Sequence, residues 1–224
     1  MNQIYEITKF TTTDYQDELA CIVWFGRCNM RCIYCYNIDA VLNQGKITND
    51  EFLNFLKSRV GKLSGVVFSG GECTLCRDFL TLCRNVKNLG YKLKVDTNGT
   101  NLDIIKQALD ENLIDYIALD FKAHIDIFKE ITKSNLYYKF EKTLQYLIKI
   151  DFKFEVRTTI HTDFINENDI SQMAQYLENL GYKNNYYLQN FLQTNHNFTK
   201  LPPQKRVIDK NKILTKLNIV LRNF

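Results

Sequence analysis

The stretch RCNMRCIYC, residues 27–35, carries three cysteines, Cys28, Cys32 and Cys35, in the spacing Cys-x3-Cys-x2-Cys. Three thiolates so close in sequence can hold three corners of an iron-sulfur cube, whereas a closed electron-carrying cluster takes four cysteines. The spacing therefore predicts a cube whose fourth iron is open to another ligand.

Two other interpretations of these cysteines stay open. A structural zinc ion normally takes four ligands, and the fourth would come from Cys21, Cys73, Cys76 or a histidine. The three thiols could instead line one face of a core helix, although Asn29 and Arg31 would suit a buried helix poorly.

Outward from this stretch, short apolar, β-branched or aromatic runs recur and are typical of strands. Most are separated by segments with helical spacing, and the strand starts repeat at about the 30-residue pitch of βαβ units. We therefore expect an α/β fold with a largely parallel sheet, either a partial (β/α)6 barrel or an open doubly wound sheet. The predicted strands are residues 19–25, 65–69, 91–95, 116–119, 152–160 and 186–191, with 217–221 as a late edge strand.

The sequence also marks where helices begin and end. Thr48 with Glu51 and Asn166 with Asp169 resemble capping boxes, Gly90 and Gly181 stand where helices should end, and Pro202-Pro203 should begin a last helical segment.

No linker or internal repeat is evident, so we predict a single domain, residues 1–224, with residues 1–18 as an N-terminal extension packed on the barrel.

The composition is that of a compact globular protein, with 224 residues of which 45% are hydrophobic and 24% charged. The net charge of +4 is spread over interleaved basic and acidic residues, so we expect neither a nucleic-acid nor a membrane partner. No apolar run could cross a bilayer and no secretory signal is evident, so we expect a cytoplasmic location. Most thiols stay reduced there, so the seven cysteines are expected to be core residues, metal ligands or redox groups.

Unusual polar residues follow the predicted strands. In parallel α/β folds, the loops that leave the carboxyl ends of the strands build the active site. These positions are therefore candidates for one common site. They are Ser69-Gly70-Gly71-Glu72, Asp96-Thr97-Asn98-Gly99, Asp120, Lys122, Arg157, His161, Gln189 and Asn190.

In combination, these motifs resemble the radical SAM superfamily, whose signature is Cys-x3-Cys-x2-Cys with an aromatic residue, here Tyr34, before the third cysteine. The resemblance covers nearly the whole chain. Within the superfamily it is similar to the glycyl-radical-enzyme activating proteins, and most closely to the anaerobic ribonucleoside-triphosphate reductase activating proteins. The matching segments are Asp14-Tyr15, 28–37, 69–72, 96–99, 118–123, 157–159 and 187–191.

The resemblance implies an oxidoreductase that holds one [4Fe-4S] cluster through Cys28, Cys32 and Cys35 and binds S-adenosylmethionine (SAM) at the open iron. Such an enzyme reductively cleaves SAM and removes a hydrogen from a glycine of a partner glycyl radical enzyme, here an anaerobic ribonucleotide reductase. Flavodoxin or ferredoxin would donate the electron. No cysteine lies between Cys35 and Gly70, so a second cluster in a ferredoxin-like insert is not expected.

By the same resemblance, Gly70, Gly71 and Glu72 hold the amino group of SAM. The alternative is a simple turn at the end of a strand. Tyr34 would lie near the adenine or plug the core.

The resemblance also assigns roles to charged residues. Asp96, Thr97 and Asp120 match the positions that bind a monovalent cation in related activating enzymes, although either aspartate could instead cap a helix. Arg157 would pair with the carboxylate of SAM or form a surface salt bridge, and Lys122 would be a further polar partner.

The sequence departs from the family pattern at two positions. Arg27 replaces the glycine that usually precedes the first cysteine, and Cys73 replaces the proline usual after Gly-Gly-Glu. Cys73, Cys76 and Cys83 could bind a second metal or form a redox pair, but we expect core or helix-surface thiols, with Cys76 and Cys83 on one helical stripe.

The remaining cysteine and two histidines are expected to be structural. Cys21 should lie in a strand core. His124 and His161 should be packed or surface residues.

Two other functions remain as alternatives. One is a radical SAM enzyme acting on a small molecule, such as the deazapurine-forming relatives. The other is a metal-binding module without catalysis.

Overall fold

In the computed structural model, which describes residues 2–193 and 197–224, the chain forms two compact units. The first comprises Met1–Asn29, Asn37–Thr97 and Asn101–Ala118. The second comprises Met30–Tyr36, Asn98–Thr100 and Leu119–Phe224.

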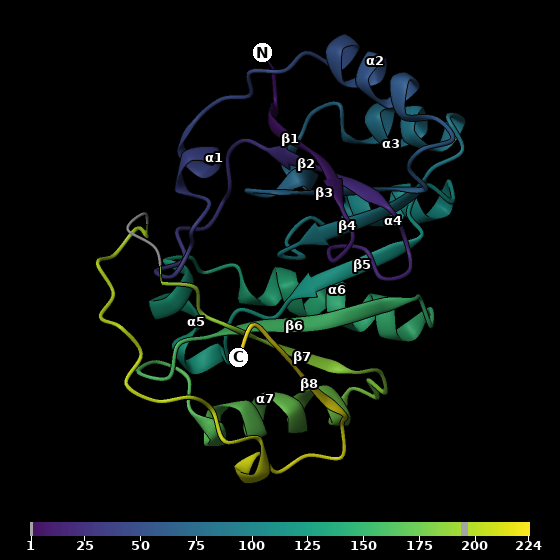
Figure 1. Cartoon of the computed structure of the whole chain (residues 1–224). Helices are drawn as coiled ribbons and strands as arrows, with labels where there is room; N and C mark the ends of the chain where they lie inside the picture. The colour runs from purple at the N-terminus through teal and green to yellow at the C-terminus, as the bar shows by residue number, and fades with distance from the viewer. Residues whose placement is uncertain (1, 194–196) are drawn as a thin grey trace. The chain divides into compact units, whose positions relative to one another are not determined.

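The first unit is a sheet with helices. Strand β2 (Ala20–Phe25) pairs in parallel with β3 (Gly65–Gly70), which pairs in parallel with β4 (Lys92–Thr97), and β1 (Ile4–Thr11) pairs with β2 antiparallel. Figure 1 labels these elements. The helices are α1 (Ile38–Leu42), α2 (Asn49–Arg59), α3 (Phe79–Asn88) and α4 (Leu102–Asp110), with a short 3-10 helix η1 at Cys73–Leu75.

Aromatic side chains fill the core of the first unit. Phe68 on β3 is fully buried, and its ring centroid lies 5.0 Å from that of Phe25, 6.1 Å from that of Phe52 and 6.0 Å from that of Phe79. These contacts join two strands to α2 and α3. Burial of such rings stabilises the fold strongly, which agrees with the apolar sequences of β2 and of the first part of β3.

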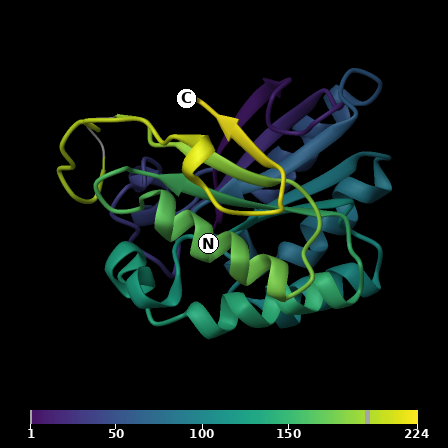
Figure 2. The ribbon, with the colours of Figure 1, turned by 90° about the horizontal axis from the view of Figure 1, so that it is seen from below.

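The second unit has parallel strands β6 (Phe154–Ile160), β7 (Tyr186–Asn190) and β8 (Ile219–Arg222). Strand β5 (Tyr116–Asp120) contributes its last two residues to this unit. Figure 2 shows α6 and α7 on one face of these strands. The helices are α5 (Ile125–Thr132), α6 (Tyr137–Lys149) and α7 (Glu167–Asn179), with a 3-10 helix η2 at Lys210–Lys212.

Most predicted elements are confirmed. Each predicted strand is present within a few residues of its expected bounds, and the late edge strand is β8. Both capping boxes form, with Thr48 and Asn166 as the N-caps of α2 and α7. Gly90 and Gly181 follow α3 and α7 with φ angles of +83° and +87°, the left-handed conformation that glycine adopts at low cost.

One element was not predicted, and one expectation needs correction. Residues 1–18 contain strand β1, whose alternation of polar and apolar residues is too irregular to predict a strand. The helix expected from Pro202-Pro203 does not form, and the segment holds the short 3-10 helix η2 instead. Its polar groups pair with α7: Glu167 accepts a hydrogen bond from the Arg206 guanidinium at 2.6 Å, and Glu178 accepts from the Lys216 N–H at 2.7 Å.

Within the described part of the chain, no helix is long and apolar enough to span a membrane. The single-domain expectation stays a prediction.

Candidate functional site

The cysteine segment folds as a loop, not as the core helix considered above. Its second half, Met30–Tyr36, belongs to the second unit and is fixed there by backbone hydrogen bonds. The N–H groups of Arg31 and Ile33 donate to the carbonyls of Thr132 and Ile131, both at 2.9 Å. These are the last two carbonyls of α5, which have no partner inside their own helix, so loop and helix end satisfy each other.

Two further contacts shape this loop. The Cys35 N–H donates to the Cys32 carbonyl at 3.0 Å, which closes a tight turn between the two cysteines. The Tyr34 hydroxyl donates to the Lys122 carbonyl at 2.9 Å, and its ring is buried. Tyr34 thus ties the turn to the end of β5, and its contact with adenine stays a prediction.

The chemistry of the donor set suits an iron-sulfur cluster. None of the seven cysteines, all of which the structure describes, forms a disulfide, so Cys28, Cys32 and Cys35 are thiols. Burial raises the pKa of Cys32 to about 11, while the nearby Lys122 ammonium opposes this rise. A metal must therefore displace a proton from Cys32 on binding, and Lys122 favours the resulting thiolate.

The structure does not present the cysteines as an assembled metal site. Over residues 2–193 and 197–224, no three His, Cys, Asp or Glu side chains form a group that could hold a metal ion. Cys28 lies in the first unit, and Cys32 and Cys35 lie in the second. Their joint role as cluster ligands therefore stays a prediction.

The Gly-Gly-Glu loop follows β3 in the first unit. Gly70 has a φ angle of +115°, and a Cβ atom there would lie 2.3 Å from the Phe25 nitrogen. A Cβ atom on Gly71 would lie 1.8 Å from the carbonyl oxygen of Arg27. Both glycines are therefore required by the close approach of the backbone that leads into the cysteine segment.

Glu72 is buried beneath this loop. One of its carboxylate oxygens accepts hydrogen bonds from the hydroxyls of Thr74 and Thr97, at 2.6 and 2.7 Å, and from the Thr74 N–H at 3.2 Å. Its own N–H donates to the Arg27 carbonyl at 2.9 Å. Glu72 is thus held in one orientation by neighbours on both sides. Its contact with SAM stays a prediction.

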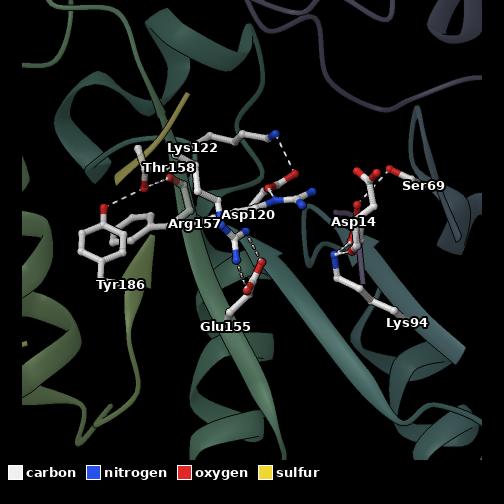
Figure 3. A network of polar contacts seen from close by, with 12 residues as sticks. Asp14, Ser69, Lys94, Asp120, Lys122, Glu155, Arg157, Thr158 and Tyr186 are labelled. Atoms are coloured by element: carbon white, nitrogen blue, oxygen red, sulfur yellow. Dashed lines mark hydrogen bonds and ion pairs between the residues drawn. The ribbon is translucent and has the colours of Figure 1, made fainter. Parts of the chain in front are cut away.

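Asp96 lies at the end of β4 in the first unit, in contact with a lysine that the sequence analysis did not identify. The Lys94 ammonium lies 3.0 Å from Asp96 Oδ1, and the Ser69 hydroxyl donates to Oδ2 at 3.1 Å. Figure 3 shows Ser69 and Lys94 with Asp14, whose carbonyl accepts a hydrogen bond from Lys94 at 2.6 Å. The spacing of two residues on a strand, which puts both side chains on one face, could have indicated this pair.

Asp120 lies at the end of β5 in the second unit, between two cations. Its carboxylate pairs with the Lys122 ammonium at 2.8 Å and accepts a hydrogen bond from Nε of Arg157. Figure 3 shows both cationic groups directed at this carboxylate. Burial alone would raise the pKa of Asp120, but Arg157 and Lys122 lower it to about 2 from the ordinary 3.8. Arg157 is therefore fixed by a partly buried ion pair rather than by a surface salt bridge.

The suggestion that Asp96 or Asp120 caps a helix is wrong. The N-cap of α4 is Asn101 and that of α5 is His124. The aspartates face cations instead.

The other cysteines are buried, as expected. Cys21, Cys73 and Cys83 are fully buried and Cys76 is 8% exposed. The helical stripe proposed for Cys76 and Cys83 is wrong, because Cys76 caps η1 and only Cys83 lies in α3. The Cys73 thiol donates to the Asp96 carbonyl at 3.4 Å, so this residue supports the end of β4.

The two histidines are structural, as expected. His161 is fully buried, contacts the ring of Phe191 and pairs through Nε2 with the Pro202 carbonyl at 3.0 Å. His124 pairs with Asp126 at 2.9 Å.

Arg27 has a φ angle of +67°, which explains why glycine is usual before the first cysteine. A non-glycine residue in this conformation costs about 1–2 kcal/mol. The arginine at this position therefore adds local strain to the backbone before Cys28.

Replacing Gly71 with alanine should displace the backbone at Arg27, because the added methyl group would overlap the carbonyl oxygen. We expect Gly71→Ala to lower the free energy of unfolding by about 1–3 kcal/mol and to reduce iron uptake during anaerobic reconstitution. Gly61→Ala is the control for iron uptake: a Cβ atom there meets nothing within 4 Å, so its cost is confined to the strain of alanine at a φ angle of +75°. Equal iron uptake by both variants would contradict this role of Gly71.

The ion pairs of Asp120 should stabilise the fold in a pH-dependent way. The folded-state pKa of Asp120, about 2, lies below the ordinary value, so the stabilisation is present above pH 4 and is lost as the pH falls towards 2. We expect it to be about 2 kcal/mol. Urea unfolding of the wild type and Asp120→Asn at pH 5 and pH 2.5 should show the difference between them shrinking. A difference that stays constant would contradict the assignment.

Comparison with known proteins finds a family and several relatives that this chain resembles. A model of the radical SAM superfamily matches residues 22–177. A relative from Methanocaldococcus jannaschii, whose assignment as a glycyl-radical enzyme activating enzyme is itself a proposal, is 30% identical over 230 residues, which cover 96% of this chain and 94% of the relative. A GTP 3',8-cyclase of Clostridium perfringens is 29% identical over 170 residues, which cover 70% of this chain and 50% of the cyclase.

A solved structure shares the fold. The protein anSMEcpe, with bound AdoMet and the Cp18Cys peptide, superimposes with a TM-score of 0.59 at 20% identity, over 77% of this chain and 52% of its own. The expected α/β class with a largely parallel sheet, consistent with a partial TIM-type barrel, is thereby confirmed. Because the family model covers more than half of its residues, the chain belongs to the radical SAM superfamily, whose members use a [4Fe-4S] cluster and SAM.

Proposed function

We propose that this protein is an activating enzyme that reductively cleaves SAM and removes a hydrogen atom from a glycine of a partner glycyl radical enzyme. The observation that carries the proposal is the relative from Methanocaldococcus jannaschii, because its similarity covers 96% of this chain and 94% of its own length. We further propose that the partner is an anaerobic ribonucleoside-triphosphate reductase and that flavodoxin or ferredoxin supplies the electron in the cytoplasm.

The cysteine loop would hold the cluster. Cys28, Cys32 and Cys35 would each bind one iron as a thiolate, leaving one iron for SAM. When bound, the reduced cluster supplies the electron that breaks the bond between the sulfonium of SAM and its 5' carbon. The turn between Cys32 and Cys35, with its hydrogen bonds to α5, fixes two of the sulfurs before the cluster binds.

The residues at the strand ends would bind SAM. Gly70 and Gly71 permit close approach of the backbone, and the carboxylate of Glu72 suits the amino group of SAM. The guanidinium of Arg157 suits the carboxylate of SAM. Since Asp120 accepts the Arg157 Nε hydrogen bond, the plane of this guanidinium is set before the ligand arrives.

Two supporting residues would define the remaining boundary of this site. Tyr34 is buried against the Lys122 backbone and would present its ring to the adenine. Lys122, paired with Asp120, would favour the thiolate form of Cys32.

A protein or peptide substrate agrees with the solved structures that share the fold. The structure of anSMEcpe contains a bound peptide beside AdoMet. A glycine segment of a partner protein would likewise present a polypeptide backbone to the site.

A small-molecule substrate is the second candidate, and the similarity to a GTP 3',8-cyclase favours it. That similarity covers 70% of this chain but only half of the cyclase. The similarity to the relative from Methanocaldococcus jannaschii covers a larger share of both chains, which favours the activating enzyme.

The test is anaerobic reconstitution with iron and sulfide, followed by an assay for 5'-deoxyadenosine with and without an anaerobic ribonucleotide reductase. We expect cleavage of SAM to yield a glycyl radical on the reductase, seen by electron paramagnetic resonance. Turnover with GTP or another metabolite and no protein radical would favour the small-molecule enzyme. Metal binding without cleavage of SAM would leave only a binding module.

Substitution of single cysteines should separate cluster ligands from structural thiols. We expect Cys32→Ala to abolish both the cluster absorbance and the cleavage of SAM, because three thiolates are needed. Cys76→Ala is the matched control, since Cys76 is also 8% exposed but lies in the other unit. Loss of the cluster in Cys76→Ala would overturn the assignment of the spare cysteines.

A further inference from the structure

Lys94 is a nearly buried lysine whose charge is matched at close range. Its side chain is 5% exposed and that of Asp96 is 10% exposed, and their charged atoms lie 3.0 Å apart. Lys94 also donates to the Asp14 carbonyl at 2.6 Å. An ammonium removed from water is costly unless it is paired and hydrogen-bonded, so Lys94 and Asp96 depend on each other.

The two hydroxyl groups beside Asp96, those of Ser69 and Thr97, also donate hydrogen bonds within this chain. Ser69 donates its hydroxyl to Asp96 Oδ2 at 3.1 Å. The Thr97 hydroxyl donates to Glu72 at 2.7 Å. The Asp96 carboxylate therefore faces a cation and a hydroxyl that are both part of this chain.

In the second unit, the negative charge of the Asp120 carboxylate is likewise balanced by cationic side chains of the same unit. The Lys122 ammonium lies 2.8 Å from Oδ2, and the Arg157 guanidinium donates to Oδ1. Two positive side chains thus face one negative side chain. Each of the two aspartates that the family resemblance assigns to a monovalent cation has a built-in positive partner.

These residues do not fit a bound monovalent cation. An ion such as K⁺ needs several oxygen ligands, and a positive charge within 3–4 Å repels it. Asp96 Oδ1 is buried and accepts no hydrogen bond, so it is the oxygen that an ion would coordinate. To do so, the ion would have to displace the Lys94 ammonium, which lies 3.0 Å from Oδ1 and forms an ion pair with it.

We propose that the Lys94 ammonium fills the position of a monovalent cation at Asp96, so that this protein binds SAM without one. Lys94 is then a positioning residue, which fixes the Asp96 carboxylate. The role of this site in binding SAM rests on the proposed function, but the occupancy of Asp96 does not.

The direct test is binding of thallium(I), a probe for K⁺, to the purified protein without substrate. We expect the ²⁰⁵Tl resonance to show no saturable site that K⁺ competes for. The melting temperature should agree to within about 1 °C in KCl, NaCl and choline chloride at equal ionic strength. One competed thallium site per chain that Asp96→Asn removes would overturn the proposal.

Removing the ammonium should create the cation site. We expect Lys94→Met to bind thallium and to melt about 3 °C higher in KCl than in choline chloride, because K⁺ then balances the buried carboxylate. Lys92→Met is the matched control on the same strand, since Lys92 is 59% exposed in its pair with Glu18. A folded Lys94→Met protein indifferent to K⁺ would overturn the role of Lys94.

These measurements need no turnover. If Lys94→Met does not fold, the thallium titration of the wild-type protein still decides whether Asp96 binds a cation. A failure of the proposed function would appear only in the assay for 5'-deoxyadenosine, so the two outcomes are distinguishable.

Discussion

The arrangement of the second unit depends on one exchange of hydrogen bonds between the cysteine loop and the end of α5. Thr132 and Ile131 offer carbonyls that no later turn of the helix can use, and Arg31 and Ile33 offer N–H groups from a loop with no regular structure. Ile33, Ile131 and Thr132 are buried, and their backbone groups would otherwise lack partners. The exchange removes this cost and fixes the backbone on either side of Cys32.

Charge is balanced at short range near the strand ends. Lys94 lies two residues before Asp96 on β4, and Lys122 lies two residues after Asp120. Side chains two residues apart lie on the same face of an extended chain. Each lysine can therefore reach its aspartate and neutralise its charge. Arg157 adds a charge from β6. Such pairs stabilise little when exposed, but burial makes the loss of one partner costly.

Much of the fold could be predicted from sequence because its signals are local. The apolar run of β3, the capping box of Thr48 and the glycine after α3 each follow from a few neighbouring residues. The N-terminal strand could not, since its pairing with β2 is a long-range contact and its own pattern is mixed. The segment after Pro203 was misread for a related reason: its partners lie on α7, far away in sequence.

The candidate site was predictable to a similar degree. The cysteine spacing and the glycines depend on local geometry, and Gly71 has a clear steric reason in the Arg27 carbonyl. Lys94 was missed because nothing in a single lysine shows that it will be buried. The hydroxyls of Thr74 and Thr97 were not predicted to converge on Glu72, because one comes from η1 and the other from the end of β4.

The path of the chain between β7 and β8 has a consequence for biosynthesis. Residues 206–216 lie along α7, and Ile219 then pairs with Tyr186. Strand β7 therefore keeps one unpaired edge until Ile219–Arg222 have left the ribosome. During that interval the nascent protein exposes backbone groups that could pair with another chain, and a chaperone or rapid closure of this segment would protect it.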